Sequence, residues 1–293
     1  MGARMISFIL ASLLGITLSA CDNRSNSSSG VNAIALADQQ RHQVMEQTRA
    51  SSYSVFPDTD DAEKLKDPTF LDAMHAESPN GSAFTIRADG LVTTNMHVIQ
   101  STNFCTGQEN AQPKDLDDAT REMSRQKEAL EREEGKKETF CLLVTQAFTK
   151  AYRAKLIKID EKNDSVLMCL ERPNGPVPFL PLALPNSFEE GAEVLTIGSP
   201  LGNMNMMTPG FISNLNFIHE DRETGQKGVA KIQFSAPILP GNSGGPLVSV
   251  ATGAVVGQVV AIIMASGFPT QMSYANPVNV LRENMNDVAP CGK

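Results

Sequence analysis

Several features that would assign this chain to a common class are missing from it. It contains no glycine-rich phosphate-binding loop, no internal repeat and no long low-complexity tract. These absences leave a nucleotide-binding fold, a repeat array and a largely unfolded chain without support. Positive charge is also in deficit, because 25 Lys and Arg residues oppose 33 Asp and Glu residues, giving a formal net charge of −8. This acidic balance argues against nucleic-acid binding.

Long apolar runs are missing as well. The apolar run near the amino end is short. Residues 5–18 are almost wholly apolar, which is fewer than the about 20 residues that a membrane-spanning helix needs. Residues 18–21 read Leu-Ser-Ala-Cys and resemble the lipobox of bacterial lipoprotein signal peptides. We therefore predict a signal peptide over residues 1–20 and an acylated Cys21, which make a periplasmic lipoprotein of the bacterial cell envelope. Asp22 resembles the signal that keeps such lipoproteins at the inner membrane. A plain secretory signal or a short membrane anchor is the alternative.

Cysteine and histidine are too widely spaced for a zinc site, so we expect no metal and no cofactor. Setting Cys21 aside leaves an even number of cysteines, which is consistent with an oxidising compartment and allows three pairings. These four are Cys105, Cys141, Cys169 and Cys291. We favour Cys105 with Cys141, which leaves Cys169 to pair with Cys291.

The residues that carry chemistry occur in three short motifs. Residues 241–246 read Gly-Asn-Ser-Gly-Gly-Pro and place Ser243 on a glycine-rich turn. Residues 94–99 read Thr-Asn-Met-His-Val-Ile at the end of an apolar strand, and residues 163–167 read Asn-Asp-Ser-Val-Leu at the start of another. Taken singly, Ser243 is an ordinary turn serine, His97 a satisfied histidine and Asp164 a strand-initiating aspartate. Together they supply a nucleophile, a base and a carboxylate in the order His, Asp, Ser.

This order and these motifs resemble the trypsin-like serine proteases of chymotrypsin fold, and more closely their bacterial HtrA-like branch. The resemblance runs from about residue 80 to about residue 281. It includes residues 196–202 and 209–213, residues 232–233 before the serine turn and residues 274–277 after it. The branch usually carries a carboxyl-terminal PDZ domain, for which no segment follows the expected closing helix, so capture of substrates by such a domain is not expected here.

The resemblance implies a role for each motif residue. His97 is the general base, Asp164 fixes its tautomer and Ser243 attacks the carbonyl of a peptide bond. The backbone N–H groups of Gly241 and Ser243 form the oxyanion hole. Asp160 is a rival of Asp164, but only Asp164 directly precedes the apolar run, as the family pattern requires. Asn242 replaces the aspartate that pairs with a new amino terminus in digestive relatives, so we expect activity without proteolytic activation.

The residues around the serine turn also predict specificity. We expect residues 235–239, which include Pro237 and Ile238, to form the floor of the substrate pocket, and residues 259–263, which include Val260 and Ala261, to form one wall. None of these side chains is charged. The pocket is therefore predicted to accept small or medium apolar residues before the scissile bond and to reject Lys and Arg.

The spacing of short strands and turns predicts an all-β fold with two six-stranded antiparallel β-barrels of chymotrypsin-like type. Asn276 is expected to cap a carboxyl-terminal helix whose first residue is Pro277. His97 and Asp164 are farther apart than in relatives, and charged residues with helical spacing fill the excess. The predicted parts are a signal peptide over 1–20, a tether and amino-terminal segment over 21–75, and a protease domain over 76–288. Within that domain they are a first barrel over 76–172 with a helical insertion over 106–140, a second barrel over 185–275 and a helix over 276–288.

These observations predict a serine endopeptidase that acts on exposed or misfolded polypeptides of the envelope. The alternative is a catalytically silent, protease-like lipoprotein that binds peptides or serves as an envelope scaffold. The insertion over 106–140 is either a solvated surface excursion or a docking element for a partner. A homotrimer is implied by the resemblance alone.

Overall fold

A computed structural model describes residues 24–58, 65, 67–74, 76–100, 140–146, 149–171, 173–203, 205–218, 228–265 and 268–292. The predicted signal peptide, Cys21, Cys105 and nearly all of the 106–140 insertion lie outside these residues. The chain divides into two compact units, Met1–Gln39 and Gln40–Lys293, and the boundary falls within helix α1 (Arg24–Ala50). Among the described residues, no helix combines the length and the apolar character that a membrane crossing requires.

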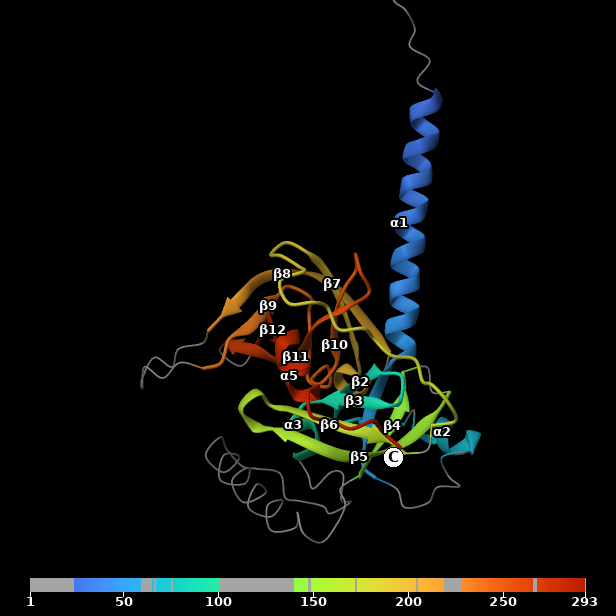
Figure 1. The fold of residues 1–293 in the computed structure, drawn as a ribbon, viewed down its shortest axis with the longest axis vertical. Coiled ribbons are helices and arrows are strands. Elements are labelled where there is room, and N and C mark those ends of the chain that lie inside the picture. The colour runs from blue at the N-terminus through green and yellow to red at the C-terminus, as the bar shows by residue number, and fades with distance from the viewer. Residues whose placement is uncertain are drawn as a thin grey trace, which may run out of the picture. The chain divides into compact units, whose positions relative to one another are not determined.

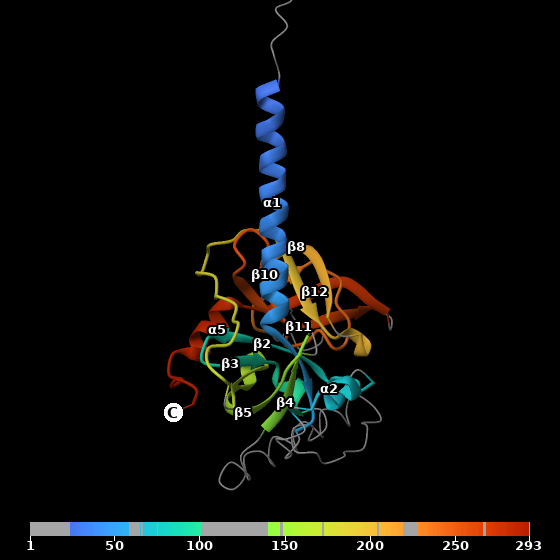
Figure 2. The same cartoon turned by 90° about the vertical axis from the view of Figure 1, so that its right-hand side faces the viewer.

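The second unit contains two closed barrels of six antiparallel strands each, which confirms the predicted fold class (Figures 1 and 2). The first barrel has the strand order β1-β2-β3-β6-β5-β4. Its strands are β1 (Ser52–Phe56), β2 (Gly81–Arg87), β3 (Leu91–Thr94), β4 (Phe140–Thr145), β5 (Ala151–Asp160) and β6 (Ser165–Leu170). Short helices α2 (Pro68–Met74), α3 (Met96–Gln100) and η3 (Glu161–Asn163) lie between them in the chain.

The second barrel has the strand order β10-β11-β12-β9-β8-β7. Its strands are β7 (Glu193–Gly198), β8 (Met206–Phe217), β9 (Lys231–Phe234), β10 (Pro246–Ser249), β11 (Val255–Ala265) and β12 (Phe268–Pro277). The 3-10 turn η4 (Pro200–Gly202) follows β7, and helix α5 (Val278–Met285) follows β12.

Strand β6 shows how the sequence places its side chains in two cores. Val166, Met168 and Leu170 point into the interior of the first barrel. Leu167, between them, belongs to a second cluster that joins the two barrels. Because successive strand residues face opposite sides, a strand buried on both sides is apolar throughout. The cluster between the barrels includes Phe84, Ile86, Leu91 and Leu167 from the first barrel and Leu195, Val248 and Val255 from the second.

The first barrel begins earlier than the predicted residue 76. Strand β1 pairs with both β2 and β4, so part of the segment assigned to a tether closes this barrel. The strand is short, and its serines are buried. Ser54, for example, bonds to the hydroxyl of Ser199 at 2.6 Å. Its partners are distant in sequence, so local pattern alone does not reveal the pairing. The predicted insertion over 106–140 ends one residue too late, because Phe140 is already the first residue of β4.

The end of the chain also differs from the prediction. Residues 268–277 form β12, which the sequence pattern did not reveal because prolines lie near both its ends and polar residues are scattered between them. Helix α5 begins at Val278, and Pro277 is its N-cap residue, without a side-chain capping bond. Asn276 is fully buried within β12 and donates to the Asn163 carbonyl at 2.7 Å, so it does not cap the helix.

Candidate active site

The pairing of β3 with β6 brings His97 and Asp164 together. Thr94, the last residue of β3, lies opposite Val166 near the start of β6. Because the strands are antiparallel, the residues just after β3 and just before β6 meet at the same end of the barrel. His97 lies in α3, immediately after β3, and Asp164 directly precedes β6. The long stretch of sequence between them therefore does not separate them in space.

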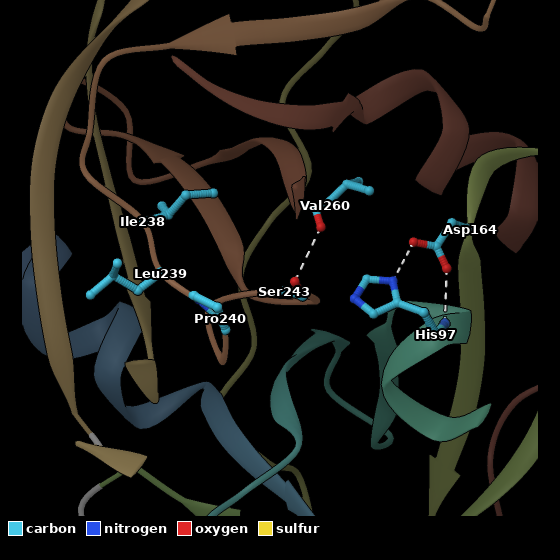
Figure 3. Close-up of a pocket in the computed structure, with 7 residues that line it drawn as sticks. All are labelled: His97, Asp164, Ile238, Leu239, Pro240, Ser243 and Val260. Atoms are coloured by element: carbon cyan, nitrogen blue, oxygen red, sulfur yellow. Dashed lines mark hydrogen bonds and ion pairs between the residues drawn. The ribbon is translucent and has the colours of Figure 1, made fainter. Parts of the chain in front are cut away.

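Two hydrogen bonds join these residues. Asp164 Oδ2 lies 2.6 Å from His97 Nδ1, and Asp164 Oδ1 accepts from the backbone N–H of His97 at 2.9 Å. The carboxylate thus fixes both the ring and the backbone of the histidine. With Nδ1 bonded to a carboxylate, the neutral ring carries its proton on Nδ1 and leaves Nε2 as an acceptor. Figure 3 shows the other ring nitrogen on the side that faces Ser243.

Asp160, the rival carboxylate, is engaged elsewhere. Its side chain accepts from the backbone N–H of Asn163 at 3.3 Å and from Asn163 Nδ2 at 2.8 Å, so it caps the short η3 turn. Asp164 has the left-handed conformation, with φ of 54°, at the end of this turn. Burial lowers the pKa of the nearby Lys231 ammonium, whereas the negative charges of Asp164 and Asp160 act in the opposite direction.

The serine turn connects β9 to β10 and is held by backbone bonds. Asn242 N–H donates to the Leu239 carbonyl at 3.0 Å, and Gly244 N–H donates to the Val259 carbonyl of β11 at 2.9 Å. Among the described residues, the N–H groups of Gly241 and Ser243 have no acceptor. Two neighbouring donors without a partner are what an oxyanion site requires.

The peptide unit between Pro240 and Gly241 is oriented so that the Gly241 N–H stays available to an acceptor other than the protein backbone. The Pro240 carbonyl accepts from the Leu201 N–H of η4 at 2.9 Å. In a trans peptide the carbonyl and the next N–H point in opposite directions, so the Gly241 N–H is turned away from Leu201. Leu201 itself has φ of 51°, an uncommon conformation for a residue with a branched side chain.

Ser82 of the first barrel holds the turn from the other side. Its N–H donates to the Ser243 carbonyl at 2.8 Å, and its hydroxyl donates to the Gly241 carbonyl at 2.7 Å. The same hydroxyl accepts from the Ser199 N–H at 3.2 Å. No local sequence pattern marks Ser82 or Leu201, because their roles depend on contacts between segments far apart in the chain.

His97, Asp164 and Ser243 line one cavity of about 330 Å³ (Figure 3). The other lining residues are Ile238, Leu239, Pro240 and Val260. Of the predicted pocket residues, Ile238 and Val260 line the cavity, Pro237 is not among the lining residues, and the Ala261 side chain lies outside the described part. Leu239, the last residue of the predicted floor segment, also lines the cavity, whereas Pro240 was not predicted. In this structure the Ser243 hydroxyl donates to the Val260 carbonyl at 3.1 Å.

Asn242, next to the nucleophile, is buried, and both its side-chain oxygen and nitrogen lack a partner among the described residues. A carboxylate at this position would be far more costly to bury unpaired than a neutral amide. The asparagine is therefore consistent with a turn that forms without a counter-charge.

The remaining predicted residues concern cross-links and metals. Cys169 of β6 is joined to Cys291 after α5, with the two Cα atoms 5.5 Å apart. Cys141 is also disulfide-bonded, and its predicted partner, Cys105, lies outside the described residues. The described part contains no group of three His, Cys, Asp or Glu side chains placed to hold a metal ion.

The Gly241→Ala substitution is expected to disrupt the donor pair. Gly241 has φ of 106°, and an added Cβ would collide with the Ser199 carbonyl oxygen. We expect the rate of Ser243 reaction with a fluorophosphonate probe to fall by about 100-fold or more, as for the loss of an oxyanion donor. Gly175→Ala is the matched control, because Gly175 has a similar φ of 90° but nothing within 4 Å of the new Cβ. Equal reaction rates for the two variants would contradict this reading of the turn.

Comparison with known proteins gives a consistent result. Residues 81–257 match the model of the trypsin-like peptidase domain. The chain is 31% identical over 213 residues to a probable periplasmic DegP-like serine endoprotease of Pseudomonas fluorescens, covering 73% of this chain and 36% of that protein. It is 25% identical over 228 residues to the chloroplastic Protease Do-like 1 of Arabidopsis thaliana, covering 78% of this chain and 43% of that protein. The chain thus spans less than half the length of these curated relatives.

A solved structure of the HtrA-type protease AlgW with a tripeptide has the same fold. Its TM-score is 0.56 at 20% identity, and the match covers 84% of this chain and 62% of that one. Identity this low supports the fold alone, whereas the match to the family model carries the family assignment. The chain belongs to the trypsin-like peptidase family, and it is similar to HtrA-type proteases.

Proposed function

We propose that this protein is a serine endopeptidase in which Ser243, His97 and Asp164 form the catalytic triad. The single observation that supports it most is the arrangement of the cavity. It joins an imidazole held by a carboxylate, a serine hydroxyl and two neighbouring backbone donors without a partner among the described residues. Each part has a separate role in acyl transfer.

The mechanism follows from these positions. The Ser243 hydroxyl turns from the Val260 carbonyl towards His97, whose free nitrogen takes the proton as the oxygen attacks the peptide carbonyl. Asp164 keeps the proton of Nδ1 in place and stabilises the imidazolium that forms. The N–H groups of Gly241 and Ser243 bind the oxygen that becomes negative. His97 then donates its proton to the leaving amine, and water hydrolyses the acyl-enzyme by the same steps.

A bond between serine and histidine in the resting structure is not a requirement for this mechanism. Catalytic hydrogen bonds are often long or misaligned without substrate and form when it binds. Rotation about the Cα–Cβ bond of one side chain is a small, fast change. The mechanism therefore requires the Ser243 side chain to rotate away from the Val260 carbonyl.

Ser243 is expected to be the residue that reacts covalently. A fluorophosphonate probe should label the unmodified chain at Ser243, and the chain should degrade an unfolded protein substrate. Ser243→Ala should abolish labelling and reduce degradation by about 10⁴-fold or more, since a triad member is lost. Ser213→Ala, at an exposed serine of β8, is the control and should retain both activities. Peptide binding by the unmodified chain without any labelling would favour the alternative, a silent peptide-binding scaffold.

The cavity also suggests which bonds are cut. Its walls beyond the triad are Ile238, Leu239, Pro240 and Val260, none of which can pair with a cation. Ile238 is almost fully buried, so a substrate side chain entering there leaves water. An unpaired ammonium or guanidinium would lose its hydration without compensation, at a cost of several kcal/mol.

Cleavage is therefore expected after small or medium apolar residues. Mass spectrometry of products from an unfolded protein should show Val, Ala, Ile or Leu at the new carboxyl ends. Peptides with Lys or Arg at that position should be cut at least about 100-fold more slowly, in proportion to the cost of burying an unpaired charge. Products that end mainly in Lys or Arg would show that another surface binds this side chain.

We further propose that the substrates are exposed or misfolded polypeptides of a bacterial envelope. The support is the periplasmic description of the DegP-like relative together with the lipobox-like residues 18–21. The inner-membrane location suggested by Asp22 stays a prediction, as do the homotrimer and a partner at the 106–140 insertion.

Acylation of Cys21 is expected in bacterial cells that process lipoproteins. An alkyne-modified fatty acid fed to such cells should label the unmodified chain, and the labelled chain should sediment with membranes. Cys21→Ser should lose the label and the membrane association, while Ser19→Thr serves as a control for a change in the same segment. Label that persists in the Cys21→Ser variant would contradict the lipoprotein assignment.

A further inference from the structure

Three amide side chains lie fully buried beneath the turn that carries Asp164. Asn95 follows β3 of the first barrel, whereas Gln258 and Asn276 belong to β11 and β12 of the second. A buried amide is costly unless its oxygen and nitrogen are hydrogen-bonded. Their concentration where the two barrels meet next to the triad therefore needs a physical reason.

Gln258 is the centre of this group. Its Oε1 accepts from Asn95 Nδ2 at 3.3 Å and from Asn276 Nδ2 at 3.3 Å. Its Nε2 donates to the Thr93 hydroxyl at 2.9 Å. One side chain of the second barrel thus orients an asparagine from each barrel and is itself fixed to β3.

The two asparagines, oriented in this way, donate hydrogen bonds to the turn. Asn95 Nδ2 donates to the backbone carbonyl of Asp164 at 2.7 Å. Asn276 Nδ2 donates to the carbonyl of Asn163, the preceding residue, at 2.7 Å. Two consecutive carbonyls are therefore held by amides that share Gln258 as their acceptor.

The turn needs such support because of its conformation. Asp164 is left-handed, with φ of 54°, which costs a residue with a Cβ about 1–2 kcal/mol. This conformation directs the carboxylate to both His97 Nδ1 and the His97 N–H. A strained conformation persists only where its surroundings determine it. On the far side Lys231 donates to Asn276 Oδ1, so Asn276 is fixed at both ends of its amide.

We propose that Gln258 is a positioning residue of the triad. Acting through Asn95 and Asn276, it holds the Asp164 turn and thereby sets the orientation of His97 from the second barrel. Gln258 is not among the residues that line the cavity, and its side chain reaches the Asp164 turn through the two asparagines, so it contributes to turnover through Asp164. This inference rests on the proposed endopeptidase function.

Gln258→Met tests the proposal, because methionine has a similar length and lacks the amide. Hydrolysis of a fluorogenic peptide with an apolar residue before the cut should show kcat reduced by about 10- to 100-fold, the scale for a small misplacement of a catalytic group. KM should stay within about twofold, since the pocket lining is unchanged. Asn276→Leu should act likewise, and the double variant should lose less than the two single losses multiplied, because both act through one turn.

Thr196→Val is the matched control. Its hydroxyl is buried in β7 of the second barrel and has no partner among the described residues. Removing it changes a buried polar group without touching the Gln258 network. Both kcat and KM should therefore equal those of the unmodified chain.

A second pair of variants decides the matter if Gln258→Met does not fold. Thr93→Ser keeps the hydroxyl that accepts from Gln258, whereas Thr93→Val removes it. We expect kcat of Thr93→Ser to stay within about threefold of the unmodified chain and that of Thr93→Val to fall by at least about tenfold, with KM unchanged. Equal kcat values for these two variants, or an unaltered kcat in folded Gln258→Met, would overturn the proposal. An unmodified chain that neither hydrolyses peptides nor reacts with a fluorophosphonate would instead contradict the proposed function itself.

Discussion

The bond from the Ser82 N–H to the Ser243 carbonyl, 2.8 Å long, is the contact on which the arrangement of the site depends. Ser82 belongs to the first barrel, which also carries His97 and Asp164, whereas Ser243 belongs to the second. The three side chains meet only if the barrels dock in one register. The hydroxyl of Ser82 adds a bond to the Gly241 carbonyl, so one residue fixes both sides of the serine turn.

Apolar and polar contacts have different tasks where the barrels meet. The cluster around Phe84, Leu167 and Val248 buries apolar surface, and each fully buried side chain of this size contributes about 1.5–3 kcal/mol. Such contacts favour docking but tolerate small shifts, because they have no directional preference. Hydrogen bonds of buried amides and hydroxyls are directional, and a shift would leave them unpaired at about 1–3 kcal/mol each. The polar bonds of Ser82 and Gln258 therefore define the register that the apolar cluster stabilises.

Local patterns in the sequence predicted most of the strands, and they singled out His97, Asp164 and Ser243, which line one cavity in the structure. The run Val-Leu-Met-Cys-Leu of β6 is apolar on both faces, and the glycines around Ser243 indicate a sharp turn. Strands β1 and β12 gave no comparable signal, because serines interrupt the first, and the second has scattered polar residues between prolines near its two ends. Asn276 was predicted to cap a helix, also on the basis of local pattern. An asparagine before a proline has the local pattern of a cap, and only the fold places it among Gln258 and Asn163.

The sequence by itself determined the family, the two-barrel fold and the motif residues, since local pattern and chemical type carry that information. The tertiary structure alone decided that Asp164 rather than Asp160 faces His97, that Leu201 holds the Pro240 carbonyl, and that Ser82 and Gln258 connect the barrels. These contacts join residues far apart in the chain. Their donors and acceptors reach hydrogen-bonding distance only when both barrels have closed and docked. Hydrogen bonding depends on such distances and angles, which no pattern along a single chain encodes.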